Sequence, residues 1–444
     1  MKELDFIVGL DVQKPTLIYE IDEIQRGVKS PVDAVSKSIE MAKREKTEFN
    51  NYIEVIEESI LKAEGIEKSV KRGNAGALAG IPIAVKDNIF TKGIRTTMAS
   101  ALFKDYYPKE DADVIKKLTE EDAIIIGKTN LHEFASGVTN VSSYFGPTRN
   151  PHDKERITGG SSGGSASSVA LGSVNVALGT DTSGSIRIPS SLCGVVGFKP
   201  TYSLISNMGV FPLSWSLDTV GVIAKSVIDA SFIINVLSEK KLNLGYIAEG
   251  VEPRKITLGY VNDESEISEL YYSAISKLNS FGFNVKRVEF NIEEARQVHS
   301  IIRLAEASAL HESRFMKYET LYSKDVAELI RLGLNIKAVD YVNALRSRKV
   351  LISEFIKLFN KVDAILTPTL TRAAPRIEEV INRELEVRRE FTKYVSFVNL
   401  IGSPAISIPM GNFNSLPLGL QIISKPFEDD KLLAIAKTIE EALS

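Results

Sequence analysis

Short apolar segments bounded by glycine or proline alternate with helical segments, and this alternation constrains the fold of the chain more than any other feature. "GIPIAVKDNIF" (80–90) and "AIIIGKTN" (123–130) have the length and the Ile/Val content of buried strands. Between them, residues 112–121 repeat their apolar positions at the period of an amphipathic helix. A strand, helix, strand order predicts a mixed or parallel sheet, so we expect an α/β protein.

The same pattern extends toward the C-terminus. Further elements are expected as a small-residue helix over 165–172, a loop over 180–191, strands over 174–179, 193–201, 363–369 and 404–409, and a closing helix over 429–443. We divide the chain into four parts: an N-terminal helical region (1–74, with helices over 15–72) that packs on the core, the functional core (75–240), a peripheral α/β insertion that shapes a pocket (241–355) and the C-terminal part of the core sheet (356–444).

The charge and cysteine content argue against several classes of partner. Lys+Arg total 54 against Asp+Glu 57, and the two signs are interspersed, so no nucleic-acid or membrane partner is expected. No apolar run approaches the about 18 residues of a membrane span, and residues 1–13 lack the apolar region of a secretory signal. The single cysteine, Cys193, excludes an intramolecular disulfide. We expect a cytoplasmic protein with no cofactor and no metal.

A serine- and glycine-rich stretch, "ITGGSSGGSASS" (157–168), interrupts the apolar pattern. A flexible linker would join self-sufficient domains, whereas an apolar helix–strand pair follows this stretch within a few residues. A phosphate-binding loop needs a lysine directly after its last glycine. Gly179 and Gly184 have the required spacing, but serine follows Gly184. The stretch therefore belongs to one domain, and a plain turn or a catalytic segment remain as its interpretations.

Nucleophilic serine chemistry is one interpretation of this stretch. Gly159, Ser161 and Gly163 match the G-x-S-x-G pattern of an α/β-hydrolase elbow, for which His299 or His311 could serve as the base. No strand directly precedes the pattern, however, and short patterns arise easily in a Gly/Ser-rich stretch.

Zinc chemistry fits the sequence less well. His132 and Glu133 open an H-E-x-x-H pattern, but Ser136 stands where the second histidine is needed. A lone histidine of this kind is expected to be a structural hydrogen-bonding group.

A lysine is the other candidate base for a serine nucleophile, because Ser–Lys variants of the catalytic triad exist. Lys86 ends an apolar strand that includes Ile83 and Val85, and burial there would lower its pKa. The alternative is a strand-end lysine that reaches water and pairs with Asp87. The residues alone leave both interpretations open.

Three long segments together resemble the amidase signature family: "GIPIAVKDNI", "GGSSGGSASSVALG" and "GTDTSGSIRIPSSLCGVVGFKPT". The similarity extends over 127–151, over 216–227 and to the C-terminal "VNLIGSPAISIPMG". It is strong over about 75–240, fair over 355–444 and weak between them. The resemblance implies a single large α/β domain with a mixed β-sheet covered by helices on both faces, and the hydrolysis of amides.

The resemblance also implies a catalytic triad, matched residue by residue. Lys86 of "AVKDN" is the base, Ser185 of "GTDTSGS" is the nucleophile, and Ser161, preceded by a cis peptide bond, relays the proton between them. Ser185 would attack the amide carbon, the leaving amine would receive a proton through the same chain, and water would hydrolyse the acyl-enzyme. The substrate would be a small-molecule amide.

In the nucleophile loop, the backbone N–H groups of Thr182, Ser183, Gly184 and Ser185 are expected to stabilise the oxyanion, each such donor contributing about 10²–10³ in rate. The family usually has glycine where Ser183 stands, and a positive φ there would strain a serine.

Four further residues are expected to support the site. Gly160 and Ser162 flank Ser161, and Asp181 and Arg187 are expected to brace the nucleophile loop as an ion pair.

Within the family, the chain resembles the A subunits of glutamyl-tRNA amidotransferases, which release ammonia from glutamine. Thr392 stands where such subunits have an aspartate that holds the glutamine ammonium. Leu329 takes the place of an expected arginine, with Arg331 two residues on. We therefore favour a stand-alone amidase acting on a less polar substrate.

The alternative is a glutaminase, the A subunit of an amidotransferase, that works with the B and C subunits. From a different class, a catalytically silent binding protein of the same fold stays open, and so does a homo-oligomer.

Overall fold

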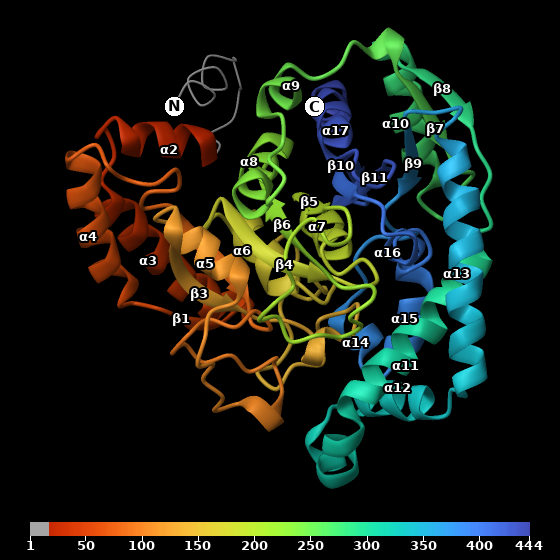
Figure 1. Ribbon diagram of the computed structural model, residues 1–444, viewed down its shortest axis with the longest axis horizontal. Coiled ribbons are helices and arrows are strands. Elements are labelled where there is room, and N and C mark those ends of the chain that lie inside the picture. Colours follow the sequence, from red (N-terminus) through yellow and green to blue (C-terminus); the bar gives the residue numbers. More distant parts are fainter. Residues whose placement is uncertain (1–16) are drawn as a thin grey trace.

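One mixed β-sheet of eleven strands forms the core in the computed structural model, which describes residues 17–444 (Figure 1). The strand order is β1 (Tyr52–Val55), β3 (Ile124–Thr129), β2 (Pro82–Lys86), β4 (Val176–Asp181), β6 (Thr219–Ala224), β5 (Val196–Lys199), β10 (Ala405–Phe413), β11 (Leu416–Ile423), β9 (Ala364–Pro368), β7 (Thr257–Tyr260) and β8 (Asn284–Arg287). β2 is parallel to β3 and β4, and β7 is parallel to β8 and β9, whereas the other pairs are antiparallel. The expected mixed α/β sheet is confirmed.

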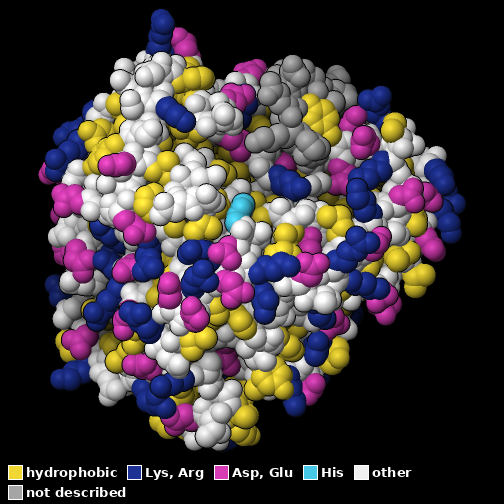
Figure 2. Space-filling view, turned by 180° about the vertical axis from the view of Figure 1, so that it is seen from behind, with side chains coloured by type: hydrophobic (Ala, Val, Ile, Leu, Met, Phe, Trp, Pro, Cys, Tyr) yellow, Lys and Arg dark blue, Asp and Glu magenta, His cyan; other side chains and the backbone are white. Residues whose placement is uncertain are grey.

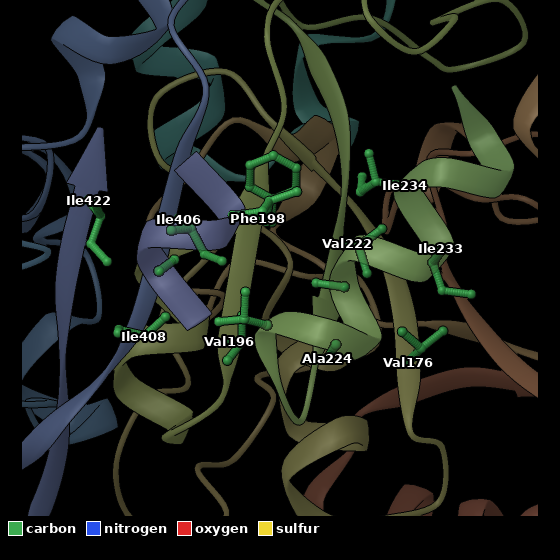
Figure 3. Close-up of a cluster of buried hydrophobic side chains, with 14 of the residues drawn as sticks. Val176, Val196, Phe198, Val222, Ala224, Ile233, Ile234, Ile406, Ile408 and Ile422 are labelled. Carbon is green, nitrogen blue, oxygen red and sulfur yellow. The ribbon is translucent and has the colours of Figure 1, made fainter. Parts of the chain in front are cut away.

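Successive residues of the central strands are buried on opposite faces of the sheet. In β4, Val176 and Leu178 belong to one hydrophobic cluster and Ala177 belongs to another. Figure 3 shows the first cluster, where Val176 and Val222 lie near Ile233 of α8 (Val227–Leu237). Because side chains alternate along a strand, two buried clusters mean that both faces are covered.

Different helices cover the two faces. α8, α10 (Ser268–Phe281) and α17 (Asp429–Leu443) join the first cluster. α3 (Pro31–Phe49) and α6 (Gly163–Leu171) join the second through Val35 and Ala166, whereas α7 (Arg187–Cys193) contributes Cys193 to the second and Ile188 and Leu192 to the first. The helices on both faces agree with the expected architecture.

The serine- and glycine-rich stretch becomes the start of α6, and its small residues allow close packing. A Cβ on Gly164 would lie 2.4 Å from the carbonyl oxygen of Asn51 and 2.5 Å from the amide nitrogen of Asn130. The hydroxyl of Ser165 lies 2.7 Å from the hydroxyl of Thr129. The stretch is therefore a tightly packed part of the core and not a linker.

The remaining helices complete the layers. They are α2 (Leu17–Gln25), α4 (Ser59–Lys71), α5 (Asp113–Glu120), α9 (Leu244–Glu249), α11 (Ile292–Tyr318), α12 (Lys324–Leu334), α13 (Ala338–Leu358), α14 (Ile377–Val380), α15 (Glu384–Phe391) and α16 (Ser396–Ile401), with short 3₁₀ turns at Ala101–Phe103, Glu133–Ala135, Pro253–Lys255 and Glu319–Leu321. Figure 1 shows α11, α12 and α13 grouped at the side of the molecule away from α3 and α4.

The expectation of helices over 15–72 is wrong at β1. Asn50 ends α3 in the left-handed region with φ of 55°, and the chain then pairs with β3, Tyr52 opposite Thr129. The apolar spacing of Ile53 and Ile56 comes from a strand followed by a turn, although it imitates a helical period. Residues 1–16, and with them the segment expected to lack a secretory signal, lie outside the described residues.

The expectation of a loop over 180–191 is wrong at its second half, where α7 begins at Arg187. The Asp181 carboxylate accepts the N–H groups of Gly184 (2.8 Å) and Ile186 (3.1 Å), which orders the chain just before the helix. These contacts are made to a side chain that lies outside the helix. Local helix propensity alone therefore does not predict α7.

The face of the molecule seen in Figure 2 shows no dominant charge. Figure 2 shows Lys/Arg and Asp/Glu side chains mixed over the face in view. Within residues 17–444, no helix combines the length and the apolar character needed to cross a membrane.

Candidate active site

Lys86 ends β2 at the centre of the site. The parallel register places Val85 opposite Leu178 of β4, so Lys86 lies near the end of that strand. Its Nζ donates hydrogen bonds to the hydroxyl of Ser161 (2.7 Å) and to the hydroxyl of Thr180 (2.8 Å). The amine therefore joins the Ser/Gly stretch to the strand that leads into the nucleophile loop.

The Lys86 amine is fully buried and has no carboxylate as a hydrogen-bond partner among the described residues. Asp87, which could have paired with it, lies 3.3 Å from Lys128 instead. Burial lowers the pKa of Lys86 from 10.5 to about 7, although Asp181 and Asp218 act in the opposite direction. A substantial fraction of the amine is therefore uncharged near neutral pH.

Ser161 lies in a segment held from both sides. The Gly160–Ser161 peptide bond is cis, and the N–H of Gly160 donates to the carbonyl of Val138 at 2.6 Å. The N–H of Ser162 donates to the carbonyl of Ser185 at 3.1 Å. These contacts bring the backbones of the two predicted catalytic serine segments together.

The nucleophile loop presents three free backbone donors. The N–H groups of Thr182, Ser183 and Ser185 have no acceptor within residues 17–444, whereas that of Gly184 donates to Asp181 at 2.8 Å. Gly184 is therefore already occupied and is not available as the oxyanion donor that we expected. Ser185 as a residue is only 4% exposed, but its hydroxyl is not fully enclosed and forms no hydrogen bond with any described residue, so it is not joined to Ser161 in this state.

The positive φ in the loop falls on Gly184, at +112°, and not on Ser183. A Cβ at Gly184 would also lie 2.3 Å from a side-chain carbon of Val395. Serine at 183 is therefore compatible with the backbone, because the neighbouring glycine takes the conformation that side chains disfavour.

Asp181 and Arg187 form a fully buried ion pair at 2.8 Å. The Arg187 guanidinium also donates to Gln421 (2.6 Å), to Asn399 (2.7 Å) and to the carbonyl of Val395 (3.0 Å). Burial alone would raise the pKa of Asp181, but Arg187 holds it well below its usual range. The pair fixes the nucleophile loop against β11 and α16.

Neither histidine considered as a base contacts Ser161. His299 Nε2 lies 2.9 Å from the carbonyl of Thr182, so this nitrogen donates and is not available to accept a proton. Burial, together with the nearby arginines, lowers the pKa of His299 to about 3. His311 Nδ1 lies 3.1 Å from the hydroxyl of Tyr322. The elbow mechanism therefore finds no base here.

His132 is part of a buried cluster of polar side chains. Its Nε2 lies 2.9 Å from a carboxylate oxygen of Asp325. Glu384 is also close, so the three side chains have the spacing of a group that could hold a metal ion. The two Glu384 oxygens, however, accept the N–H of Val138 (2.7 Å) and the hydroxyl of Thr139 (2.6 Å). Asp325 and Glu384 raise the pKa of His132 despite its burial, so the cluster is best described as an ion-pair brace.

A cavity of about 220 Å³ lies beside the nucleophile loop. Its lining consists of Ser183, the α11 residues Glu293, Arg296, Gln297, His299, Ser300 and Arg303, and Arg388, Arg389, Thr392 and Ser396 from α15 to α16. A larger adjacent cavity of about 790 Å³ shares Glu293, Arg296 and Arg389 with it. We refer to the smaller one as the loop cavity.

The residues compared with the glutamine-binding positions lie in different places. Thr392 lines the loop cavity. Leu329 is buried on α12, and Arg331 is exposed and paired with Glu319. Neither Leu329 nor Arg331 belongs to the lining of the loop cavity.

Sequence reasoning missed Thr180 and Arg303. Thr180 could have been found from the parallel pairing of β2 with β4, which brings its hydroxyl to Lys86. Arg303 lies one helical turn from His299, a spacing that would have shown the shared face once α11 was placed against the loop.

Comparisons with known proteins show which proteins the chain is similar to in sequence. A family model described as Amidase matches residues 33–433. The A subunit of the glutamyl-tRNA(Gln) amidotransferase from Sulfolobus acidocaldarius is 35% identical over 464 residues, with 95% of this chain and 97% of the relative covered. The same subunit from Archaeoglobus fulgidus is 36% identical over 450 residues, covering 92% of this chain and 95% of the relative.

Solved structures give the same picture. A crystal structure of an amidase has a TM-score of 0.90 at 31% identity and covers 97% of this chain and 100% of that chain. The A subunit of the glutamyl-tRNA(Gln) amidotransferase from Thermotoga maritima has a TM-score of 0.82 at 35% identity, covering 97% of this chain and 95% of that chain.

Proposed function

Because the chain belongs to the amidase family, we propose that it hydrolyses a carboxylic acid amide to the acid and ammonia or an amine, with Lys86, Ser161 and Ser185 as its catalytic residues. One observation carries the proposal: a buried lysine amine, with no carboxylate partner among the described residues, lies 2.7 Å from the Ser161 hydroxyl, to which the charged amine donates and from which the neutral amine accepts a hydrogen bond. Burial lowers the pKa of such an amine, so a substantial fraction of it is uncharged near neutral pH and can act as a base.

The reaction begins with proton transfer along the two hydroxyls. Ser185 Oγ attacks the amide carbon while its proton passes to Ser161, and the Ser161 proton passes to the neutral amine of Lys86. The contact between the two hydroxyls is formed with substrate in place, since catalytic hydrogen bonds commonly tighten only in the substrate complex.

The tetrahedral intermediate places a negative charge on the former carbonyl oxygen. The free N–H groups of Thr182, Ser183 and Ser185 are the donors available to it, and each contributes about 10²–10³ in rate. Lys86 then returns its proton through Ser161 to the leaving nitrogen, the C–N bond breaks, and Ser185 is left as an ester. Water, deprotonated by the same chain, hydrolyses this acyl-enzyme.

A glutaminase is the second candidate, because curated relatives at 35–36% identity are described as amidotransferase A subunits. In this alternative the substrate is glutamine and the partners are the amidotransferase B and C subunits. Thr392 in the loop cavity, and the pairing of Arg331 with Glu319 outside its lining, favour the stand-alone amidase. A glutamine ammonium beside Thr392 would find one carboxylate in the lining, that of Glu293, which is already paired with Arg296.

Covalent labelling tests the proposed function and separates it from a silent binding protein. We expect a fluorophosphonate probe to modify Ser185 in the folded protein, as located by mass spectrometry, and Ser185→Ala to lose both the label and essentially all turnover. A folded wild-type protein that stays unlabelled at Ser185 would contradict the proposal.

Incubation with glutamine and with a panel of aliphatic and aromatic amides separates the two enzymes. Ammonia release from glutamine alone would favour the glutaminase. Hydrolysis of other amides by the isolated chain supports the stand-alone amidase.

A further inference from the structure

Arg303 is a buried cation without a partner among the described residues. It is only 3% exposed, and no hydrogen bond or ion pair joins its guanidinium to any residue within 17–444. One of its terminal nitrogens is fully enclosed and unpaired. Leaving a charged, hydrogen-bonding group buried without a counter-charge is costly, so such a group is usually paired or binds a ligand.

The surroundings of Arg303 add positive charge and do not neutralise it. The loop cavity is lined by four arginines and a single carboxylate, Glu293, which is already paired with Arg296 at 2.6 Å. The charge of Glu384 also acts on Arg303, but this carboxylate already accepts hydrogen bonds from the N–H of Val138, the hydroxyl of Thr139 and the Arg388 guanidinium. Arg388 itself keeps an unpaired Nε. The cavity is therefore prepared for an anion.

The position of Arg303 relates this cavity to the reaction. On α11, His299 contacts the carbonyl of Thr182, and Arg303 follows four residues later, about 6 Å farther along the helix axis. The lining includes Ser183 but neither Lys86 nor Ser161, which must reach the leaving nitrogen. The lining also lacks Ser185, so a group in this cavity is assigned to the acyl side of the substrate, away from the reacting carbon.

We propose that the loop cavity binds a carboxylate at the far end of the acyl group, with Arg303 as the residue that determines this specificity. The preferred substrates are then monoamides of short dicarboxylic acids that lack an ammonium group, because the lining offers no free carboxylate to receive one. The inference rests on the proposed amidase function and names the substrate class for the same site. It also revises the less polar substrate that we expected from the sequence.

Matched pairs of amides test the proposal. Malonamate, succinamate and glutaramate are compared with the neutral propanamide, butanamide and pentanamide of equal chain length. We expect at least one acid amide to exceed its neutral partner by about 100-fold in kcat/KM, since a hydrogen-bonded buried charge pair is worth that much. Equal kcat/KM within each of the three pairs would overturn the proposal.

Arg303→Met removes the charge and keeps the length of the side chain. We expect it to abolish the preference for the acid amide, to leave the neutral amide within about threefold of wild type, and to melt at the same or a higher temperature. Arg303→Lys should recover part of the preference. Arg346→Met, at an exposed arginine of α13 outside the lining, is the matched control and should change neither value. A parallel loss on both amides, or a lower melting temperature, would indicate a structural role and overturn the assignment.

Binding to Ser185→Ala, measured by calorimetry, makes the test independent of turnover. The best acid amide should bind this variant and fail to bind the variant that also carries Arg303→Met. If Ser185 of the wild-type protein is not labelled but the acid amide still binds through Arg303, the proposed function is wrong and the carboxylate site stands. If inorganic phosphate binds as tightly as the acid amide, the cavity takes a free anion and the substrate assignment is wrong.

Discussion

Replacing Lys86 by methionine should give a stability difference from wild type that depends on pH with a defined slope. The pKa of this lysine is 10.5 in the unfolded chain and about 7 in the folded protein. Between these values the unfolded chain binds a proton that the folded protein does not. Wild-type stability should therefore rise with pH across this window and level off below about pH 7, where both states bind the proton.

The magnitude follows from the linkage of one proton. A single proton difference gives about 1.4 kcal/mol per pH unit, or about 4 kcal/mol between pH 7 and pH 10. Lys86→Met has no such term, so its advantage over wild type should shrink by that amount as the pH rises. The lost hydrogen bonds to Ser161 and Thr180 shift the whole curve by about 1–3 kcal/mol each without changing its slope.

Urea denaturation of both proteins at half-unit intervals from pH 6 to pH 10 measures this difference. Lys92→Met, at an exposed lysine, is the matched control, and its difference from wild type should not vary with pH. Parallel curves for wild type and Lys86→Met would show that the buried amine stays charged when folded. Lys86 could then not act as the proposed base, because a charged amine cannot accept a proton.

Three further outcomes are expected. Ser161→Ala should lower kcat by at least about 10³-fold with little change in KM, because the proton path from Ser185 to Lys86 is interrupted, and steady-state kinetics with a loss below tenfold would contradict this role. The value of kcat/KM should fall about tenfold per pH unit below about pH 7 as Lys86 is protonated, whereas a flat pH–rate profile from pH 5 to pH 8 would exclude it as the base. Asp181→Asn leaves Arg187 buried without its counter-charge and should cost about 3–5 kcal/mol in urea denaturation, with a cost below 1 kcal/mol arguing against a braced loop.

The core strands could be predicted from the sequence because they are short apolar runs bounded by breakers. Residues 80–90 and 123–130 became β2 and β3, and the helix between them became α5. α7 could not be predicted in the same way, since its seven residues contain Pro189 and depend on the contacts of Asp181 and Arg187 for their order. The strand β1 was hidden by apolar residues that happen to repeat at a helical spacing.

The residues of the site also fall into those that sequence motifs predict and those that only the folded arrangement shows. The resemblance over long motifs pointed to Lys86, Ser161 and Ser185, and the structure joins the first two directly. Whether an N–H in the nucleophile loop is free depends on where the Asp181 carboxylate turns, which no motif records, and so Gly184 was assigned a role that its hydrogen bond prevents. Arg303 lies in the part of the chain where resemblance is weakest. The role inferred for Arg303 rests on its lack of a hydrogen-bond partner within the described residues, and only the three-dimensional arrangement shows this lack.

The hydrogen bond from Arg187 to Gln421 has a consequence for the nascent chain during translation. These two residues are 234 positions apart, so a ribosome adding 5–20 residues per second needs roughly 10–50 s to deliver the second after the first. Until then the guanidinium lacks its distant acceptor, and the nucleophile loop is synthesised but not yet fixed in place. The nucleophile loop should therefore reach its final arrangement only near the completion of translation.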